Sequence, residues 1–129
     1  NPNTLSLNSG TSAIHLALRL ANIGPGDEVI TTPMTCTATN MPIMATGAKM
    51  VWADIDPVTG LICPDSIRSK ITKKTKAIIM VHFGGIPCQI DEINEIAKSN
   101  NILTIEDAAH SFGSSYKNKR CPCTIIPRW

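Results

Sequence analysis

Apolar residues along this chain follow two periods, one typical of helices and one typical of buried strands. The segments 11–22, "TSAIHLALRLAN", and 89–100, "QIDEINEIAKSN", place apolar residues three and four positions apart, which predicts a helix in each. The segments 76–83, "KAIIMVHF", and 102–106, "ILTIE", are continuous apolar runs of strand length. Such runs are expected for strands that are covered on both faces.

Four further segments complete the pattern. Residues 28–32 and 49–55 read as strands and 63–71 as a short helix. Residues 38–47 have no clear period, but their length and terminal glycine favour a helix with Pro42 in its first turn. Helix and strand therefore alternate, which predicts a three-layer α/β fold with a mostly parallel sheet and helices on both faces. In such sheets ligands bind at the carboxyl ends of the strands.

Composition limits the class of protein and its partners. The 129 residues suffice for one domain, and 43% hydrophobic with 17% charged residues is a globular balance. A net charge of +2 gives no argument for nucleic acid, and the densest basic cluster, 70–76, reads as a solvated helix end and connector, with a phosphate-binding patch as the alternative. No apolar run approaches the ~20 residues that span a bilayer, and no signal peptide is recognisable. We therefore expect a cytoplasmic protein without a membrane segment.

The cysteines argue against both a disulfide framework and a metal site. Their number is odd and their spacing irregular, which suits a reducing compartment. The motif "CPC" at 121–123 has one intervening residue, where zinc knuckles use two or more, and no matching pair follows. We expect no metal ion. Cys36 lies in a connector after a strand and should face the ligand region, where packing or contact with a cofactor is favoured over a reactive thiol.

The first predicted helix opens with "NSGTSA" at 8–13. Gly10 permits a close backbone approach, and Thr11 and Ser12 add hydroxyl groups beside the free N–H groups of a helix start. Such an end can hold a phosphate. The alternative is an ordinary N-cap made by Ser9 or Thr11.

Asp107 directly follows the buried strand 102–106. A carboxylate at that place can pair with a protonated ring nitrogen of a heteroaromatic cofactor and keep the ring cationic. The alternative is an N-cap for the segment 108–113, "AAHSFG". His110 would contact the face of such a cofactor or its phenolic oxygen. A structural, hydrogen-bonded histidine is the reading that the sequence alone favours for both His110 and His82.

In order along the chain, "NSGTSAIHLAL", "IGPGDEVITTPMTCTATN", "TGAKMVWADIDPVTG", "ITKKTKAIIMVHFGG" and "IEDAAHSFGSSYKNK" resemble the DegT-type sugar aminotransferases, a family of fold-type-I pyridoxal-phosphate enzymes. The resemblance covers nearly all of residues 7 to 119. It implies that Gly10, Thr11 and Ser12 hold the phosphate of pyridoxal 5′-phosphate. It also implies that Asp107 faces the pyridine nitrogen and that His110 lies beside the ring, near its phenolic oxygen.

The chain departs from the family in two places. Cys36 matches a position where the family usually carries an aromatic residue stacked on the ring, and a thiol has no such flat face. After Lys119 the family continues to a lysine that forms a Schiff base with the cofactor, whereas this chain reads "RCPCTIIPRW". We therefore expect residues 1–119 to be a partial cofactor-binding large domain and residues 120–129 to be an atypical tail, from a frameshift or a truncation. The first residue, Asn rather than Met, also suggests a piece of a longer protein.

None of the lysines stands in the Schiff-base context, so we expect no catalytic residue in this chain and no activity from it alone. These lysines are Lys49, Lys70, Lys73, Lys74, Lys76, Lys98, Lys117 and Lys119.

The resemblance implies a whole protein that moves an amino group, from glutamate, to a nucleotide-linked keto-sugar, with its sites built across a homodimer. Such amino sugars enter surface polysaccharides or glycosylated metabolites. Two alternatives remain: a non-catalytic truncated remnant that binds phosphate-bearing ligands weakly, and a pyridoxal-phosphate-dependent sugar dehydratase. A nicotinamide-dependent dehydrogenase is disfavoured, because the first turn lacks the required glycine spacing.

Overall fold

The computed structural model describes residues 4–121 and 126–128. Its helices are α1 (Gly10–Leu20), α2 (Thr37–Thr46), α3 (Pro64–Lys70) and α4 (Ile90–Ser99), with a 3₁₀ turn η1 (Phe83–Gly85). Its strands are β1 (Glu28–Thr31), β2 (Lys49–Trp52), β3 (Thr75–Val81), β4 (Leu103–Asp107), β5 (Ser115–Tyr116), β6 (Lys119–Arg120) and β7 (Ile126–Arg128).

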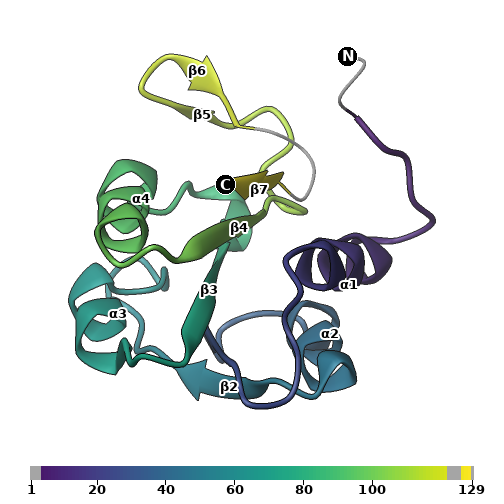
Figure 1. Ribbon diagram of the computed structural model, residues 1–129. Helices are drawn as coiled ribbons and strands as arrows, with labels where there is room; N and C mark the ends of the chain where they lie inside the picture. Colours follow the sequence, from purple (N-terminus) through teal and green to yellow (C-terminus); the bar gives the residue numbers. More distant parts are fainter. Residues whose placement is uncertain (1–3, 122–125, 129) are drawn as a thin grey trace.

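Five strands form one sheet in the order β2-β1-β3-β4-β7. The pairs β1–β2, β1–β3 and β3–β4 are parallel, and only β7 joins antiparallel, along β4 from Thr104 to Glu106. The strands β5 and β6 pair separately as a small hairpin that projects beyond the sheet (Figure 1). The mostly parallel sheet that the sequence predicts is confirmed.

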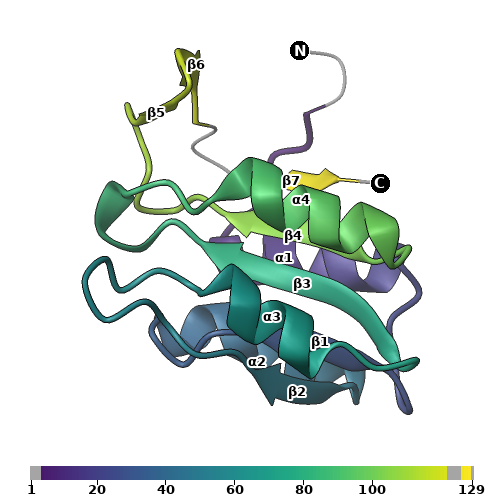
Figure 2. The ribbon, with the colours of Figure 1, turned by 90° about the vertical axis from the view of Figure 1, so that its left-hand side faces the viewer.

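Helices cover both faces of the sheet, with α1 and α2 on one side and α3 and α4 on the other (Figures 1 and 2). The side chains of β3 alternate between the two layers. Ile78 and Met80 pack in the core under α3 and α4, whereas Ala77 and Ile79 pack in the core under α1 and α2. This alternation follows from the period of two along a strand. The predicted three-layer arrangement is therefore confirmed, and it explains why the strand is apolar on every residue.

Helix α2 confirms the helix predicted over 38–47 to within one residue at each end, but its proline lies elsewhere than expected. The helix begins at Thr37, after the extended residue Cys36, so Pro42 lies inside it. The expectation that Pro42 occupies the first turn is wrong. A proline there removes one intrahelical hydrogen bond, and the helix continues because Pro42 and Ile43 are buried against the sheet side of the core. The helix ends at Gly47, whose φ of 81° is the left-handed conformation that favours glycine.

The predictions for the chain end are only partly covered by the structure. Residues 122–125, which include Cys123 of the "CPC" motif, and residue 129 lie outside the described residues. The division at residue 119 and the atypical tail 120–129 stay predictions. Among the helices in the described part of the chain, none is both long and apolar enough to cross a membrane.

Candidate active site

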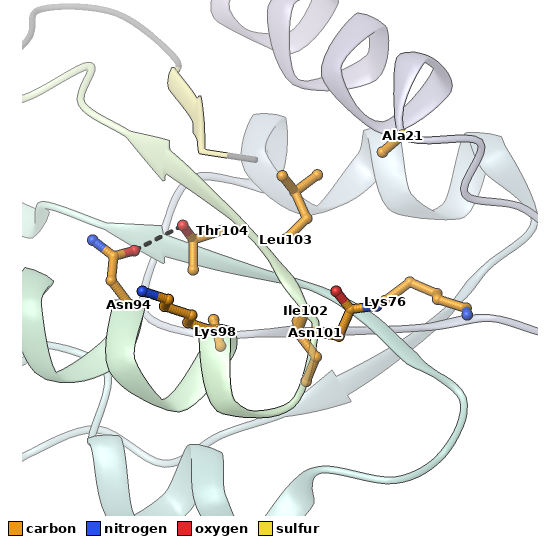
Figure 3. Close-up of a pocket in the computed structure, with 9 residues that line it drawn as sticks. Ala21, Lys76, Asn94, Lys98, Asn101, Ile102, Leu103 and Thr104 are labelled. Carbon is orange, nitrogen blue, oxygen red and sulfur yellow. Dashed lines mark hydrogen bonds between the residues drawn. The ribbon is translucent and has the colours of Figure 1, made fainter.

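The structure contains a large cavity of about 910 Å³ at the amino ends of β3 and β4. Figure 3 shows Lys76 at the start of β3, Asn94 and Lys98 from α4, and Thr104 from β4 around it, with a hydrogen bond from Thr104 to Asn94. Parallel sheets bind ligands at the opposite, carboxyl end of their strands. Size alone therefore does not make this cavity the candidate site.

A second cavity, of about 280 Å³, lies at the carboxyl ends of β3 and β4. It is lined by the start of α1, the connector from β1 into α2, and the segment that begins at the end of β4. Of the residues predicted to bind a cofactor, Ser12 does not line it. The others do: Gly10, Thr11, Cys36, Asp107 and His110. The fold therefore brings together, around one opening, residues as far apart in the sequence as Gly10 and His110.

Asp107 is the last residue of β4, whereas the sequence predicted that it directly follows the strand. Only 7% of the residue is exposed. Its Oδ2 accepts a hydrogen bond from the Thr39 hydroxyl at 2.7 Å. Its Oδ1 accepts one from the Ala109 N–H at 3.2 Å. Residues 108–113 form turns rather than a helix, so Asp107 makes an Asx-type turn instead of the N-cap considered above. Both oxygens of the Asp107 side chain therefore act as hydrogen-bond acceptors.

Thr39 and Thr35 are functional candidates that sequence reasoning missed. Their hydroxyl oxygens lie 2.7 Å apart, and either could be the donor on geometry alone. The single hydroxyl proton of Thr39 already points to Asp107, so Thr35 must donate to Thr39. The two hydroxyl groups and the carboxylate form one chain of hydrogen bonds with a fixed direction. The only signal in the sequence is their spacing of four, with Thr35 in the connector before α2 and Thr39 in the first turn of the helix.

Glu106 precedes Asp107 but faces the opposite layer, because neighbours along a strand point to opposite faces. It is fully buried together with His82, and Glu106 Oε2 lies 3.1 Å from His82 Nε2. The other ring nitrogen, Nδ1, accepts a hydrogen bond from the N–H of Cys88 at 3.2 Å. An accepting Nδ1 carries no proton, so Nε2 carries it and donates to Glu106. The structural histidine predicted at position 82 is confirmed.

The start of α1 has the N-cap that was considered as the alternative for it. Ser9 is the N-cap: its hydroxyl accepts from the Ser12 N–H at 3.1 Å and donates to the Ser12 hydroxyl at 3.0 Å. The first residues of the helix, Gly10 and Thr11, carry N–H groups without intrahelical acceptors. A Cβ built at Gly10 would meet no protein atom within 4 Å. The cap therefore uses Ser12, while the backbone of Gly10 and Thr11 is open to the cavity.

His110 lies at the rim and is exposed. Its ring is 6.0 Å from that of Phe83, edge to face. The loop after β3 packs closely against the backbone of His110, because a Cβ at Gly85 would lie only 2.9 Å from the His110 carbonyl oxygen. Ser114 donates to the carbonyl oxygen of Gly85 at 2.6 Å. The loops after β3 and β4 thus hold each other at the site, and Gly85 is required by this close approach.

Thiol labelling tests which side chains face the cavity. Burial, and then the negative charge of Glu106, raise the pKa of Cys88 to about 12, so this thiol stays protonated at pH 8. Cys36 is exposed at the cavity. We expect iodoacetamide at pH 8 to modify Cys36 and spare Cys88, as peptide mass spectrometry will show. A modified Cys88, or a Cys36 that iodoacetamide does not modify, would contradict this placement of the two thiols.

Comparison with solved structures defines the class of protein. The aminotransferase DesV of S. venezuelae, solved with a ketimine intermediate, superposes with a TM-score of 0.86 at 37% identity over 88% of this chain and 31% of DesV. The PLP form of the sugar aminotransferase Spr1654 of Streptococcus pneumoniae gives a TM-score of 0.82 at 38% identity over 88% of this chain and 33% of Spr1654. The fold is that of the N-terminal part of an aminotransferase large domain.

Residues 1–123 match the DegT/DnrJ/EryC1/StrS aminotransferase family, and the chain belongs to this family. The resemblance found from its motifs is therefore confirmed. The chain is 46% identical to the GDP-perosamine synthase of Escherichia coli O157:H7 over 88% of its length. It is 44% identical to the spore coat polysaccharide biosynthesis protein SpsC of Bacillus subtilis over 89%. It spans only 31% and 30% of the lengths of these two relatives.

Proposed function

We propose that the whole protein is a pyridoxal-phosphate-dependent aminotransferase that moves an amino group from glutamate to a nucleotide-linked keto-sugar. Its family and its similarity to a GDP-perosamine synthase support the substrate class. The observation that carries the proposal is the cavity that Asp107 shares with the open start of α1. A buried carboxylate and a helix start are the two partners that the ring nitrogen and the phosphate of this cofactor require.

The residues present fit the cofactor. Asp107, whose two oxygens each accept one hydrogen bond, would keep a proton on the ring nitrogen. The N–H groups of Gly10 and Thr11 would bind the phosphate, with the helix dipole in support. The open space beside Gly10 leaves room for that group. When bound, the protonated ring withdraws electrons from the amino-acid α-carbon during transfer.

The described lining of the cavity contains no lysine or arginine. The phosphate would therefore be bound here by backbone N–H groups and the Thr11 hydroxyl, without a cationic side chain from this lining. A residue that anchors the cofactor covalently and moves the substrate proton must then come from a part of the whole protein outside this lining. We propose that this chain alone therefore does not catalyse the reaction. We also propose that the whole protein is a homodimer, in which the second copy contributes to the site.

Pyridoxamine phosphate is the appropriate probe for the cofactor site, because it already carries the amino group and needs no lysine for binding. We expect the protein to bind it with micromolar affinity in isothermal titration calorimetry. Pyridoxamine, which lacks the phosphate, should bind at least about tenfold more weakly, the loss of about one charge-assisted contact. No measurable binding of pyridoxamine phosphate would contradict the proposed function.

The reaction itself is tested in the whole protein. Incubation with glutamate and a nucleotide-linked keto-sugar should yield 2-oxoglutarate and an amino sugar in equal amounts, as mass spectrometry will show. Cofactor binding without this exchange would support a sugar dehydratase or a remnant instead.

A further inference from the structure

We propose that Thr39, with Thr35 behind it, is a positioning residue that fixes the carboxylate of Asp107 for the ring nitrogen. The inference rests on the proposed function and goes beyond it, because it assigns a role to two hydroxyl groups outside the predicted cofactor contacts. It concerns how the carboxylate is oriented, whereas the proposed function concerns what the carboxylate binds.

Two separate elements hold the two oxygens of Asp107. The Thr39 hydroxyl, from α2, donates to Oδ2 at 2.7 Å, and the Ala109 N–H, from the turn after β4, donates to Oδ1 at 3.2 Å. Rotation of the carboxylate about its last bond would break both hydrogen bonds. The plane of the carboxylate is therefore held from two sides before any ligand enters, which reduces the ordering cost of binding.

The direction of the hydrogen bonds strengthens this arrangement. Thr39 donates its hydroxyl proton to Asp107, so its oxygen accepts the hydrogen bond from the Thr35 hydroxyl. A hydroxyl that accepts one hydrogen bond is a better donor in the next. Thr39 is 2% exposed, so water does not compete at this position.

The helix that carries Thr39 is itself tied to the sheet. Its next residue, Asn40, accepts a hydrogen bond from the Thr31 hydroxyl at 2.8 Å and donates to the Thr32 carbonyl oxygen at 3.1 Å. Both threonines belong to the end of β1 and the residue after it. The start of α2 is therefore fixed on the neighbouring strand, and Thr39 presents its hydroxyl to Asp107 from a rigid support.

The test compares two ligands in one variant. In Thr39→Val the hydroxyl is replaced by a methyl group of similar size. We expect the affinity for pyridoxamine phosphate to fall about tenfold, the effect of one hydrogen bond to a charged group. The 1-deaza analogue, in which CH replaces the ring nitrogen, should bind the variant and the unaltered protein alike. Calorimetry measures all four affinities, and Thr39→Ser, which keeps the hydroxyl, should restore the first.

Thr46→Val is the matched control, because Thr46 lies in the same helix, is also buried, and donates to the Ile43 carbonyl oxygen rather than to the site. It should leave both affinities unchanged. If Thr39→Val binds pyridoxamine phosphate as the unaltered protein does, or loses both ligands equally, the positioning role is wrong. Failure of the unaltered protein to bind pyridoxamine phosphate would instead contradict the proposed function.

Discussion

Replacing Asp107 with asparagine is expected to weaken the binding of pyridoxamine phosphate about hundredfold, because removing one partner of a buried charge pair costs about 2–5 kcal/mol. The amide also fits its own surroundings poorly. Thr39 and Ala109 each donate to a different oxygen of Asp107. Asn offers one acceptor oxygen and one NH₂ group, which only donates, so either the Thr39 hydroxyl or the Ala109 N–H would face another donor.

Titration calorimetry of the Asp107→Asn variant measures this effect, with the 1-deaza analogue as the internal reference. That ligand has no ring nitrogen, so its affinity should change much less. Asp65→Asn is the control variant, since Asp65 is exposed on α3, on the other side of the sheet. Equal binding of pyridoxamine phosphate by Asp107→Asn and the unaltered protein would remove the central contact of the proposed site.

Replacing His82 with leucine is expected to lower the free energy of unfolding by about 1.5–3 kcal/mol, the contribution of one hydrogen bond to a charged group. The substitution removes the imidazole donor from the buried carboxylate of Glu106. The N–H of Cys88 loses its acceptor at the same time, which adds to the loss. Urea unfolding followed by circular dichroism measures the change.

The double variant His82→Leu/Glu106→Leu separates the pair from its surroundings. Because it removes the carboxylate together with its partner, it should be less destabilised than the sum of the two single variants. Thr104→Val on the same strand, whose hydroxyl donates to Asn94, is a control with an expected loss of about 1 kcal/mol. Additive effects at positions 82 and 106 would show that the two side chains do not depend on each other.

The order and type of most elements could be predicted from the sequence because they have a clear apolar period. The run 76–83 indicated a strand buried on both faces, and the side chains of β3 pack into both cores. Residues 38–47 have no clear period, but their length and terminal glycine placed α2 to within one residue at each end, and only the position of Pro42 within the helix was missed. The strand order could not be predicted, because no local pattern records that β1 lies between β2 and β3.

The candidate site was accessible to sequence reasoning only in part. A polar residue after an apolar run marks a strand end, so Asp107 and the start of α1 could be placed near a ligand. The contact between Thr39 and Asp107 joins residues 68 positions apart. It depends on α2 packing beside the end of β4, which requires the strand order. The same holds for the pairing of Glu106 with His82 across β4 and β3.

Strand β4 places the carboxylate of Glu106 in the core and that of Asp107 at the cavity. This arrangement limits which insertions and deletions the strand can tolerate. A single-residue insertion or deletion between Leu103 and Glu106 would turn the strand over and exchange the environments of the two carboxylates. Glu106 would then reach the opening on a longer arm, and Asp107 would be buried too far from His82 to replace it. We expect the length of this segment to be invariant among functional descendants, even where its apolar residues drift.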